Sequence, residues 1–438
     1  MLDFKNKNVY ERIFEGHFGL EKESLRVTED GTFAQTLHPF HGMDHITRDF
    51  SENQIEINTP VCDSAEEAIE ELKSYTLKIQ KALANMNPRE YLWLNSNPPY
   101  IEKEKDIPIA VYGQEEMDKR IYREYLAVRY GRYRMAFSGI HVNYSFSEDL
   151  IKAGFAASGF MDFREYKDRL YLKLAENLAS YGWIVTAVTA ASADMDGSFF
   201  ERRKKGKTTF LGMASVRCSE LGYWNMFTPV FDYTSLSSYA KSISRYVENG
   251  FISFPSELYY PIRLKPCGEN KLENLAEGGV DHIELRNVDL NPMSCSGLDL
   301  RDLKFIQYLL IWAVNTPRTA LSEADQIQVA QNFKNAARYD LKTVNIVYKN
   351  GEFDTVAKAG QKLIGRMKDF YSVNLNSEDD RYREVMDILD FEEKKFTDPD
   401  TRYAAILHQH CSELFFEKNL EFAKQIQERI VFPDKKMT

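Results

Sequence analysis

The sequence predicts an α+β fold in which a mainly antiparallel sheet is followed by a helical C-terminal third. Short segments that alternate apolar with polar residues dominate the first third of the chain, and segments with helical spacing dominate the last. Strands followed by a run of helices are typical of α+β proteins and not of a doubly wound parallel sheet. No internal repeat, low-complexity tract or Pro/Gly/Ser-rich linker divides the chain. We therefore expect a single domain over residues 1–438, rich in strands over 1–300 and helical over 301–438.

The first predicted strand, residues 19–26, carries two glutamates on one face. Side chains on a strand repeat every two residues, so Glu21 and Glu23 point the same way. Three further segments alternate apolar with polar residues in the same manner: 52–57, 138–144 and 281–286. A merely solvated face would favour Lys, Thr and Ser, whereas these polar positions hold Glu, His, Asn and Arg. The pattern predicts one packed face and one face that forms an active site.

The first long helix is predicted from a capping box. Ser64 is its N-cap and Glu67 follows three residues later, after which apolar spacing continues for about six turns. A second helix is expected over 115–130, where Gly131 ends it. Further helices are expected near 162–181, 235–249, 300–315, 322–338, 353–370, 377–389 and 411–429.

Composition excludes several classes of protein. The net charge of −10 and the pI near 5.5 argue against nucleic acid as a partner, because phosphate binding requires clustered Lys and Arg. The one basic cluster, residues 202–207, is interpreted as a solvated loop. The longest apolar stretch, 305–314, is about half of what a membrane span requires, so we expect a buried helix and no membrane partner.

The five cysteines point to a reducing compartment. They show no CxxC spacing and leave an odd thiol, which indicates neither a structural zinc nor a disulfide framework. The N-terminus has no apolar run of the kind found in signal peptides. A cytoplasmic location is therefore expected. Neither a P-loop nor a strand-linked G-x-G-x-x-G occurs, so any nucleotide is held in another way.

The carboxylates on the polar face fit divalent cations. Glu21, Glu23, Glu56 and Glu284 would repel one another in a shared site unless metal ions or arginines neutralised them. Magnesium takes oxygen ligands and commonly bridges carboxylates to substrate phosphates, and two or three such ions would supply the charge. Asp49 lies an odd number of residues before Glu56, so we place it on the loop that enters that strand.

Two more side chains share this face, each with two interpretations. His141 is either a metal ligand or a hydrogen-bonded structural residue, and Asn143, on the same side, is a candidate substrate-binding residue. Arg286, two residues after Glu284, either stabilises the charge that develops in phosphoryl transfer or forms a salt bridge to one of the glutamates.

Arginines and tyrosines outside the strands suggest a pocket for a small zwitterion. Arg217 with Ser219 could hold an amino-acid carboxylate through the planar guanidinium fork. Tyr122, Arg123 and Tyr223 supply further groups of the same types. Taken alone each is weak evidence, because aromatic residues at helical spacing are usually core residues.

Read in order, these segments resemble the glutamate–cysteine ligase family, specifically the bacterial type and the N-terminal half of bifunctional glutathione synthetases. The ordered set is far more specific than any single block. The matching blocks are 19–26, 49–60, 122–123 with 129–131, 138–144, 217 with 221–223, 257–263, and 283–286 followed by 289–292.

The resemblance implies a fold akin to the catalytic domain of glutamine synthetase: a curved, mainly antiparallel sheet whose concave face holds the substrates, with helices on the convex side. It implies ATP as co-substrate, L-glutamate and L-cysteine as substrates, Mg²⁺ (or Mn²⁺) as cofactor, and a monomer or weak homo-oligomer. By similarity, Arg123 and Arg217 match substrate-binding positions, and Arg286 matches the position that assists phosphoryl transfer. Phe50, Tyr122 and Tyr223 match positions around the acceptor cysteine, and the metal-ligand positions are Glu21, Glu23, Asp49, Glu56, His141 and Glu284.

Two loops depart from the family pattern. Relatives tend to have Trp-Pro-x-Ser-Met-Pro where this chain has Trp-Leu-Asn-Ser-Asn-Pro at 93–98, and Gly-Ala-Ser-Pro where it has Ala-Ala-Ser-Ala at 190–193. The leading hypothesis is ATP-dependent formation of γ-glutamylcysteine, the first step of glutathione biosynthesis. The alternatives are a γ-glutamyl ligase with another acceptor amine, which the altered loops permit, and a non-catalytic relative that binds a nucleotide or an amino acid.

Overall fold

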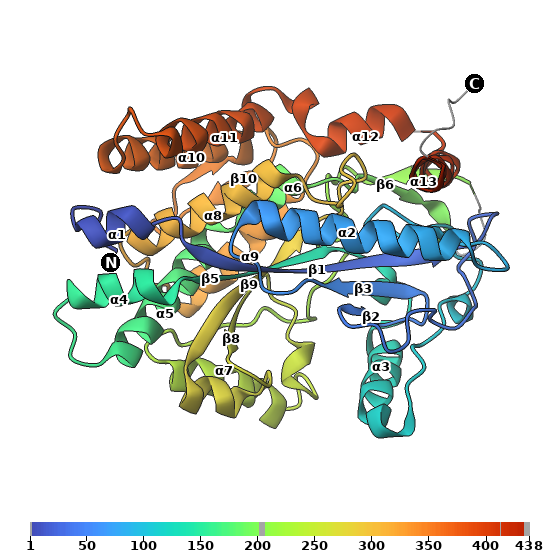
Figure 1. The fold of residues 1–438 in the computed structure, drawn as a ribbon, viewed down its shortest axis with the longest axis horizontal. Helices are drawn as coiled ribbons and strands as arrows, with labels where there is room; N and C mark the ends of the chain where they lie inside the picture. The colour runs from blue at the N-terminus through green and yellow to red at the C-terminus, as the bar shows by residue number, and fades with distance from the viewer. Residues whose placement is uncertain (1, 201–205, 412, 433–438) are drawn as a thin grey trace.

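The fold is organised around one seven-stranded antiparallel sheet. The structure, a computed structural model, describes residues 2–200, 206–411 and 413–432. The strands run in the order β2-β3-β1-β5-β9-β8, with β4 paired to the end of β1. Their bounds are β1 Gly16–Val27, β2 Ile46–Arg48, β3 Gln54–Asn58, β4 Tyr91–Leu92, β5 Ile140–Phe146, β8 Ile262–Pro266 and β9 Val280–Val288. The predicted α+β class with a mainly antiparallel sheet is confirmed (Figure 1).

Helices cover the apolar face of this sheet. α2 (Ala65–Ala84) packs on β1, and α5 (Phe163–Tyr181) and α6 (Trp183–Thr189) pack on β9. The alternation along β1 sets which side chains face them: Lys22 turns toward α2, where its Nζ lies 3.1 Å from Thr76 Oγ1, so Glu21 and Glu23 turn to the opposite face. One buried apolar cluster extends from Leu2 to Phe396, which supports the proposal of a single domain.

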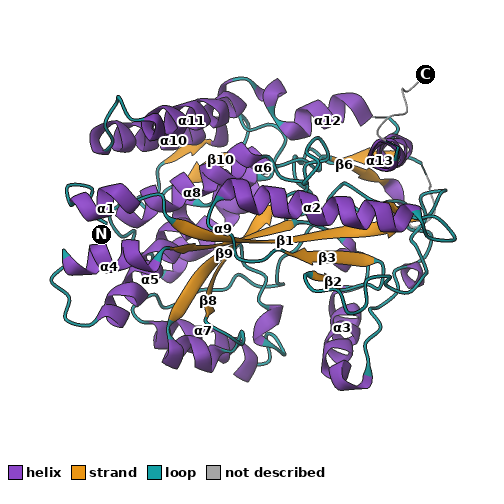
Figure 2. Cartoon of the chain, in the orientation of Figure 1, coloured by secondary structure: helices purple, strands orange, loops and turns teal. Residues whose placement is uncertain are grey.

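The C-terminal third is helical, as the sequence predicts (Figure 2). α8 (Leu300–Asn315) includes the apolar stretch predicted to be a buried helix, and its residues from Phe305 to Val314 are all buried. The other helices of the predicted set are α3 Met117–Tyr130, α7 Leu236–Glu248, α9 Glu323–Ala336, α10 Val356–Asn374, α11 Asp380–Thr397 and α13 Phe415–Val431. Among the described residues, no helix combines the length and apolar content that would cross a bilayer.

Helix ends agree with the predicted caps in most places. Ser64 Oγ accepts a hydrogen bond from the Glu67 N–H at 3.1 Å, as predicted. The Glu67 carboxylate, however, accepts from the backbone N–H of Asp63 and not from that of Ser64, so the second hydrogen bond of the capping box forms one residue earlier. α3 ends at Gly131, whose φ of 79° lies in the left-handed region that glycine favours.

Three predicted helix boundaries are wrong. The helix expected over 377–389 continues eight residues further, as α11 (Asp380–Thr397). Residues 353–355 form β11 (Phe353–Thr355), which pairs with β10 (Asn345–Val347), and only then does α10 begin. The helix expected over 411–429 is two elements, because α12 (Tyr403–Cys411) ends where it was expected to start. Short elements were not predicted: α1 Lys7–Arg12, α4 Glu148–Ala156, α6, and the pair β6 Asp194–Asp196 and β7 Thr208–Phe210. Most of the basic cluster 202–207 lies outside the described residues.

Candidate active site

The polar face of the sheet forms one wall of a cleft of about 400 Å³. The cleft is bounded by β1, β3, β5, β8 and β9, by α3, and by the loop after β2. Most residues predicted from the sequence line it: Glu21, Glu23, Asp49, Phe50, Glu56, Tyr122, Arg123, His141, Tyr223, Glu284 and Arg286. The period of two along each strand, together with the antiparallel register, brings them to one place.

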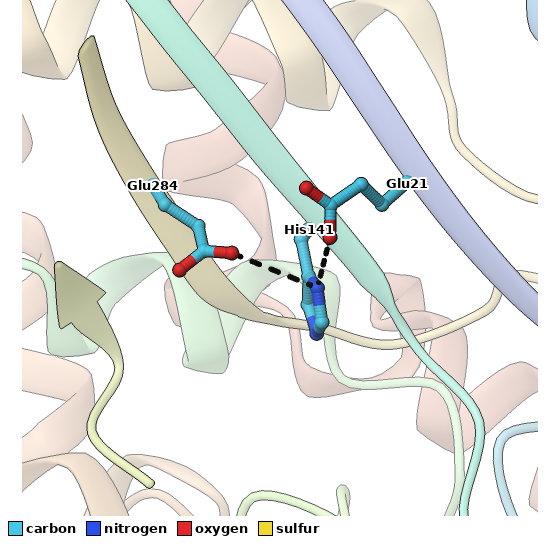
Figure 3. Close-up of side chains that lie close together, drawn as sticks. All are labelled: Glu21, His141 and Glu284. Carbon is cyan, nitrogen blue, oxygen red and sulfur yellow. Dashed lines mark hydrogen bonds and ion pairs between the residues drawn. The ribbon is translucent and has the colours of Figure 1, made fainter. Parts of the chain in front are cut away.

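Three neighbouring strands each contribute one ligand-type side chain to the centre of the cleft (Figure 3). His141 Nδ1, on β5, lies 2.8 Å from Glu21 Oε2 on β1 and 4.0 Å from Glu284 Oε1 on β9. One donor atom from each of the three lies within 4.8 Å of the other two, a spacing that a single cation can bridge. Burial and the charge of Arg286 lower the pKa of His141, so the neutral ring has a lone pair to offer. Asn143, also on β5, donates through Nδ2 to Glu21 Oε1 at 2.9 Å.

The carboxylates on the β1–β3 side of the cleft are crowded. Glu23 and Glu56 lie directly opposite each other in the ladder. Burial and the nearby charge of Asp49 raise the pKa of Glu23 to about 8, and burial with the charges of Asp49 and Glu21 raises the pKa of Glu56 well above its usual value. Asp49 lies one residue beyond β2, on the loop where the sequence predicts it. The ionised forms of these carboxylates therefore destabilise one another, and their oxygen donors fit hard divalent cations.

The β8–β9 side of the cleft is cationic. Arg286 Nη1 donates to Glu284 Oε1 at 2.9 Å, Lys265 Nζ lies 3.4 Å from the same oxygen, and Arg263 Nη1 lies 3.9 Å from Glu284 Oε2. Burial raises the pKa of Glu284, but the charges of these three residues outweigh it and hold that pKa far below its usual value. Sequence reasoning did not assign Arg263 and Lys265, although the alternation over 262–266 places both on the polar face.

α3 forms a lateral wall and is fixed by one buried glutamate. Tyr125 and Tyr130 donate their hydroxyls to Glu257 at 2.9 and 2.6 Å, and Arg129 completes the contact with an ion pair of 2.6 Å. This attachment holds Tyr122 and Arg123 at the cleft, where Arg123 Nε donates to the Asp49 carbonyl at 2.5 Å.

Of the predicted pair of Arg217 and Ser219, only Arg217 lies beside the cleft. Arg217 is buried and lines a small cavity beside the cleft, together with Tyr223 and Arg286. Its guanidinium packs against Gly139, where a Cβ would meet Arg217 Cζ at 2.1 Å. Ser219 does not reach the cleft, because its hydroxyl donates to Val216 O and accepts from Leu221 N within a local turn.

Comparison with known proteins identifies the family. The model described as glutamate-cysteine ligase matches residues 1–255 and 228–336. The chain belongs to the glutamate–cysteine ligase family. It is 35% identical to the glutathione biosynthesis bifunctional protein GshAB of Listeria welshimeri over 97% of this chain, but spans only 55% of that protein, about half its length.

The chain spans most of the length of two further relatives. A glutamate–cysteine ligase of Serratia proteamaculans is 29% identical over 94% of this chain and 87% of its own length. The crystal structure of a glutamate–cysteine ligase from Francisella tularensis, solved in complex with AMP, superposes with a TM-score of 0.83 at 21% identity, covering 95% of this chain and 89% of that one. This last likeness shows the shared fold.

The two loops expected to depart from the family pattern, residues 93–98 and 190–193, contact each other. Asn97 Nδ2 donates to the carbonyls of Ser192 and Asp194 at 2.9 and 2.8 Å. Ser192 Oγ donates in turn to Asp289 Oδ2 at 2.6 Å, and Ser215 Oγ donates to Asp289 Oδ1 at 2.9 Å. Residue 215 begins the turn that carries the buried Arg217. The hydrogen bonds through Asp289 therefore connect both loops to that turn.

Proposed function

We propose that this protein is an ATP-dependent carboxylate–amine ligase that joins the γ-carboxylate of L-glutamate to the amine of L-cysteine. The observation that carries the proposal is the polarised cleft, in which clustered carboxylates on β1 and β3 face Arg263, Lys265 and Arg286 on β8 and β9. Such an arrangement suits a metal-bound polyphosphate beside a zwitterion, because each needs charges of both signs close together.

Bound magnesium would neutralise phosphate charge and orient the nucleotide. The residues proposed to hold two or three such ions, with Mn²⁺ as a substitute, are Glu21, Glu23, Asp49, Glu56, His141 and Glu284. A feature of the donor set supports this fit: Glu284 Oε2 is buried and accepts no hydrogen bond from the described residues. A buried carboxylate oxygen without a hydrogen bond is costly, and a bound cation would remove that cost.

The proposed reaction has two steps. A γ-carboxylate oxygen of glutamate attacks the terminal phosphorus of ATP, and ADP leaves to give a γ-glutamyl phosphate. The amine of cysteine then attacks the acyl carbon, phosphate leaves with the C–O bond electrons, and the nitrogen loses a proton to form the amide. The protein contributes mainly the positions of the reactants and fixed charges.

Arginines and aromatic residues have positioning roles in this scheme. Arg286 is proposed to stabilise the charge that builds up on the transferring phosphoryl group, since its guanidinium is a fixed donor fork inside the cleft. Arg123 and Arg217 are proposed to bind amino-acid carboxylates. Phe50, Tyr122 and Tyr223 are proposed to enclose the acceptor.

A different acceptor amine is the second candidate. It is favoured by the contact between the two altered loops, because the Asn97–Ser192–Asp289 chain of hydrogen bonds supports the turn that carries Arg217. A change behind that arginine would alter the acceptor pocket while leaving the metal and phosphate groups in place.

One assay tests both candidates. ADP release is measured with Mg²⁺, ATP and L-glutamate, with and without L-cysteine and a panel of other amines, and the products are detected by mass. Cysteine-dependent turnover to γ-glutamylcysteine is the expected result. Glutamate-dependent ADP release with a clear preference for another amine would favour the second candidate, and ATP binding without any ADP release would instead indicate a non-catalytic relative.

A further inference from the structure

A second cavity, of about 640 Å³, lies in the helical part of the molecule, outside the proposed active site. It is larger than the cleft of about 400 Å³ on the sheet. Its walls come from the junction of α5 and α6, from α9, from the β10–β11 hairpin and from the first half of α10. Figure 1 shows β10 lying beside α10, away from β3 and α3. The size falls within the range of small-molecule sites, about 300–1,000 Å³.

The cavity is preformed because a buried side chain anchors the hairpin. Asn332, on α9, donates through Nδ2 to Val347 O at 2.9 Å and accepts from Val347 N at 3.0 Å. Through these two hydrogen bonds, the side-chain amide of Asn332 pairs with the backbone of β10 as a neighbouring strand would. The hairpin is thereby held at a fixed distance from α9, and the space behind it stays open.

The deeper wall of the cavity is apolar. Trp183, Val329, Ile346 and Leu363 line it and are buried. Ser180 also belongs to the lining, but its hydroxyl is shielded from solvent and has no hydrogen-bond partner among the described residues.

Among the described residues, the rim carries two cations outside any ion pair, Arg366 and Lys349, together with the carboxylate of Glu352. Arg366 lies over the rings of Tyr181 and Trp312, at 5.4 and 5.1 Å from their centroids, and Lys349 donates to the carbonyls of Thr319 and Ala320. Within the described part of the chain, neither cation forms an ion pair. By contrast, Lys362 at the same rim is paired with Asp354 at 2.5 Å.

We propose that this cavity is a second binding site, for a small organic anion with an apolar or aromatic body. The body would fill the wall formed by Trp183 and its neighbours, and a carboxylate, sulfonate or phosphate group would meet Arg366 and Lys349 at the rim. An apolar pocket with a few convergent polar groups is the usual form of such sites.

One backbone carbonyl between two lining residues of the cavity contacts β9. Gly182 lies between Tyr181 and Trp183, which both line the cavity, and its carbonyl accepts from Asn287 Nδ2 at 3.2 Å. Asn287 also donates to Thr186 Oγ1 at 2.8 Å and directly follows Arg286 on β9. The proposed binding site does not rest on the proposed function.

Binding is tested first with 8-anilinonaphthalene-1-sulfonate, an apolar body with one sulfonate, added to the whole folded protein. One saturable site is expected. Arg366→Gln should weaken binding about tenfold, as expected for the loss of one charge-assisted contact. Ala359→Trp places a large side chain in the cavity and should abolish binding. Arg245→Gln, at an exposed position on α7, is the matched control and should bind like the wild type.

Two further measurements keep the proposal separate from the proposed function. Glu284→Gln, which disables the proposed catalytic cleft, should still bind the probe with unchanged affinity. Indole-3-propionate should displace the probe, and uncharged indole should displace it far less. Absence of a saturable site, equal displacement by indole and its propionate, or unchanged affinity in Arg366→Gln would each overturn the proposal. If Ala359→Trp fails to fold by circular dichroism, Arg366→Gln and the displacement pair decide.

Discussion

Arg286 Nη1 donates to Glu284 Oε1 at 2.9 Å, and the two side chains project from one face of β9 because they are two residues apart. The cleft thus holds a proposed metal ligand and a proposed phosphate-binding cation in direct contact. Glu284 would help to hold the metal ion, and Arg286 would donate to a phosphate oxygen from the same face of the strand. Of the two interpretations of Arg286 drawn from the sequence, the salt bridge is observed, and phosphoryl stabilisation stays a proposal.

Glu284→Gln should abolish most turnover while the protein stays folded. The variant keeps the size of the side chain but removes the charge that Arg286 and a metal ion would share, and the loss of kcat should be about 100-fold or more. Turnover and the thermal unfolding midpoint are measured together, with Glu273→Gln at an exposed position as control. Near-normal kcat in Glu284→Gln would contradict the proposed role.

Arg286→Lys should lower kcat by about 10- to 100-fold and change KM for glutamate far less, because lysine keeps the charge but loses the two-pronged donor geometry. Steady-state kinetics give both constants. Arg245→Lys serves as the control. A rise in KM without a fall in kcat would instead assign Arg286 to uniform binding of substrate.

The polar face of the sheet was predictable because strand parity is a local property. Glu21 and Glu23, His141 and Asn143, and Glu284 and Arg286 are three pairs two residues apart, and antiparallel pairing aligned their polar faces across β1, β5 and β9. Arg263 and Lys265 follow the same rule on β8 and were accessible to the same reasoning.

The rest of the site depends on contacts that no local pattern encodes. Ser219 follows Arg217 by two residues, but the turn between them uses its hydroxyl, so parity does not apply outside a strand. The fixing of α3 by Glu257 and the close approach of Gly139 to Arg217 join segments far apart in the chain. Residues 353–355 were predicted as helix because a three-residue strand is too short to show its own period.

Gly139→Ala should displace Arg217 and weaken binding of an amino-acid substrate. An alanine Cβ there would lie 2.1 Å from Arg217 Cζ, far inside van der Waals contact, so the guanidinium must move. We expect KM for glutamate or cysteine to rise about tenfold or more, as for loss of one charge-assisted contact. Gly113→Ala, where the added Cβ meets nothing within 4 Å, is the matched control. Unchanged KM values in Gly139→Ala would show that Arg217 does not bind the substrate.

Divalent cations should stabilise the protein against heat. Glu23, Glu56 and Asp49 crowd one side of the cleft, so a ligand that binds only the folded state and neutralises them raises the free energy of unfolding by about 2.7 kcal/mol at 100 times its dissociation constant. The unfolding midpoint is measured with Mg²⁺ or Mn²⁺ and after chelation. The increase should be lost in Glu21→Gln and kept in Glu273→Gln. An equal increase in both variants would place the ions elsewhere.

His38 should make the protein sensitive to acid. The imidazole is buried beside Arg48 and Arg26, and burial together with these charges lowers its pKa to about 3. The imidazole therefore binds a proton near pH 6.5 in the unfolded chain but only near pH 3 in the folded state. The stability from this site is complete above pH 6.5 and is lost as the pH falls toward 3, at about 1.4 kcal/mol per pH unit. Between pH 7 and pH 5 the loss from this residue is about 2 kcal/mol. Urea unfolding at both pH values should show a smaller difference for His38→Gln than for the wild type, whereas His410→Gln, at an exposed position, should keep the full difference. Equal pH dependence in the wild type and His38→Gln would show that the ring accepts a proton in the folded protein as readily as in the unfolded chain.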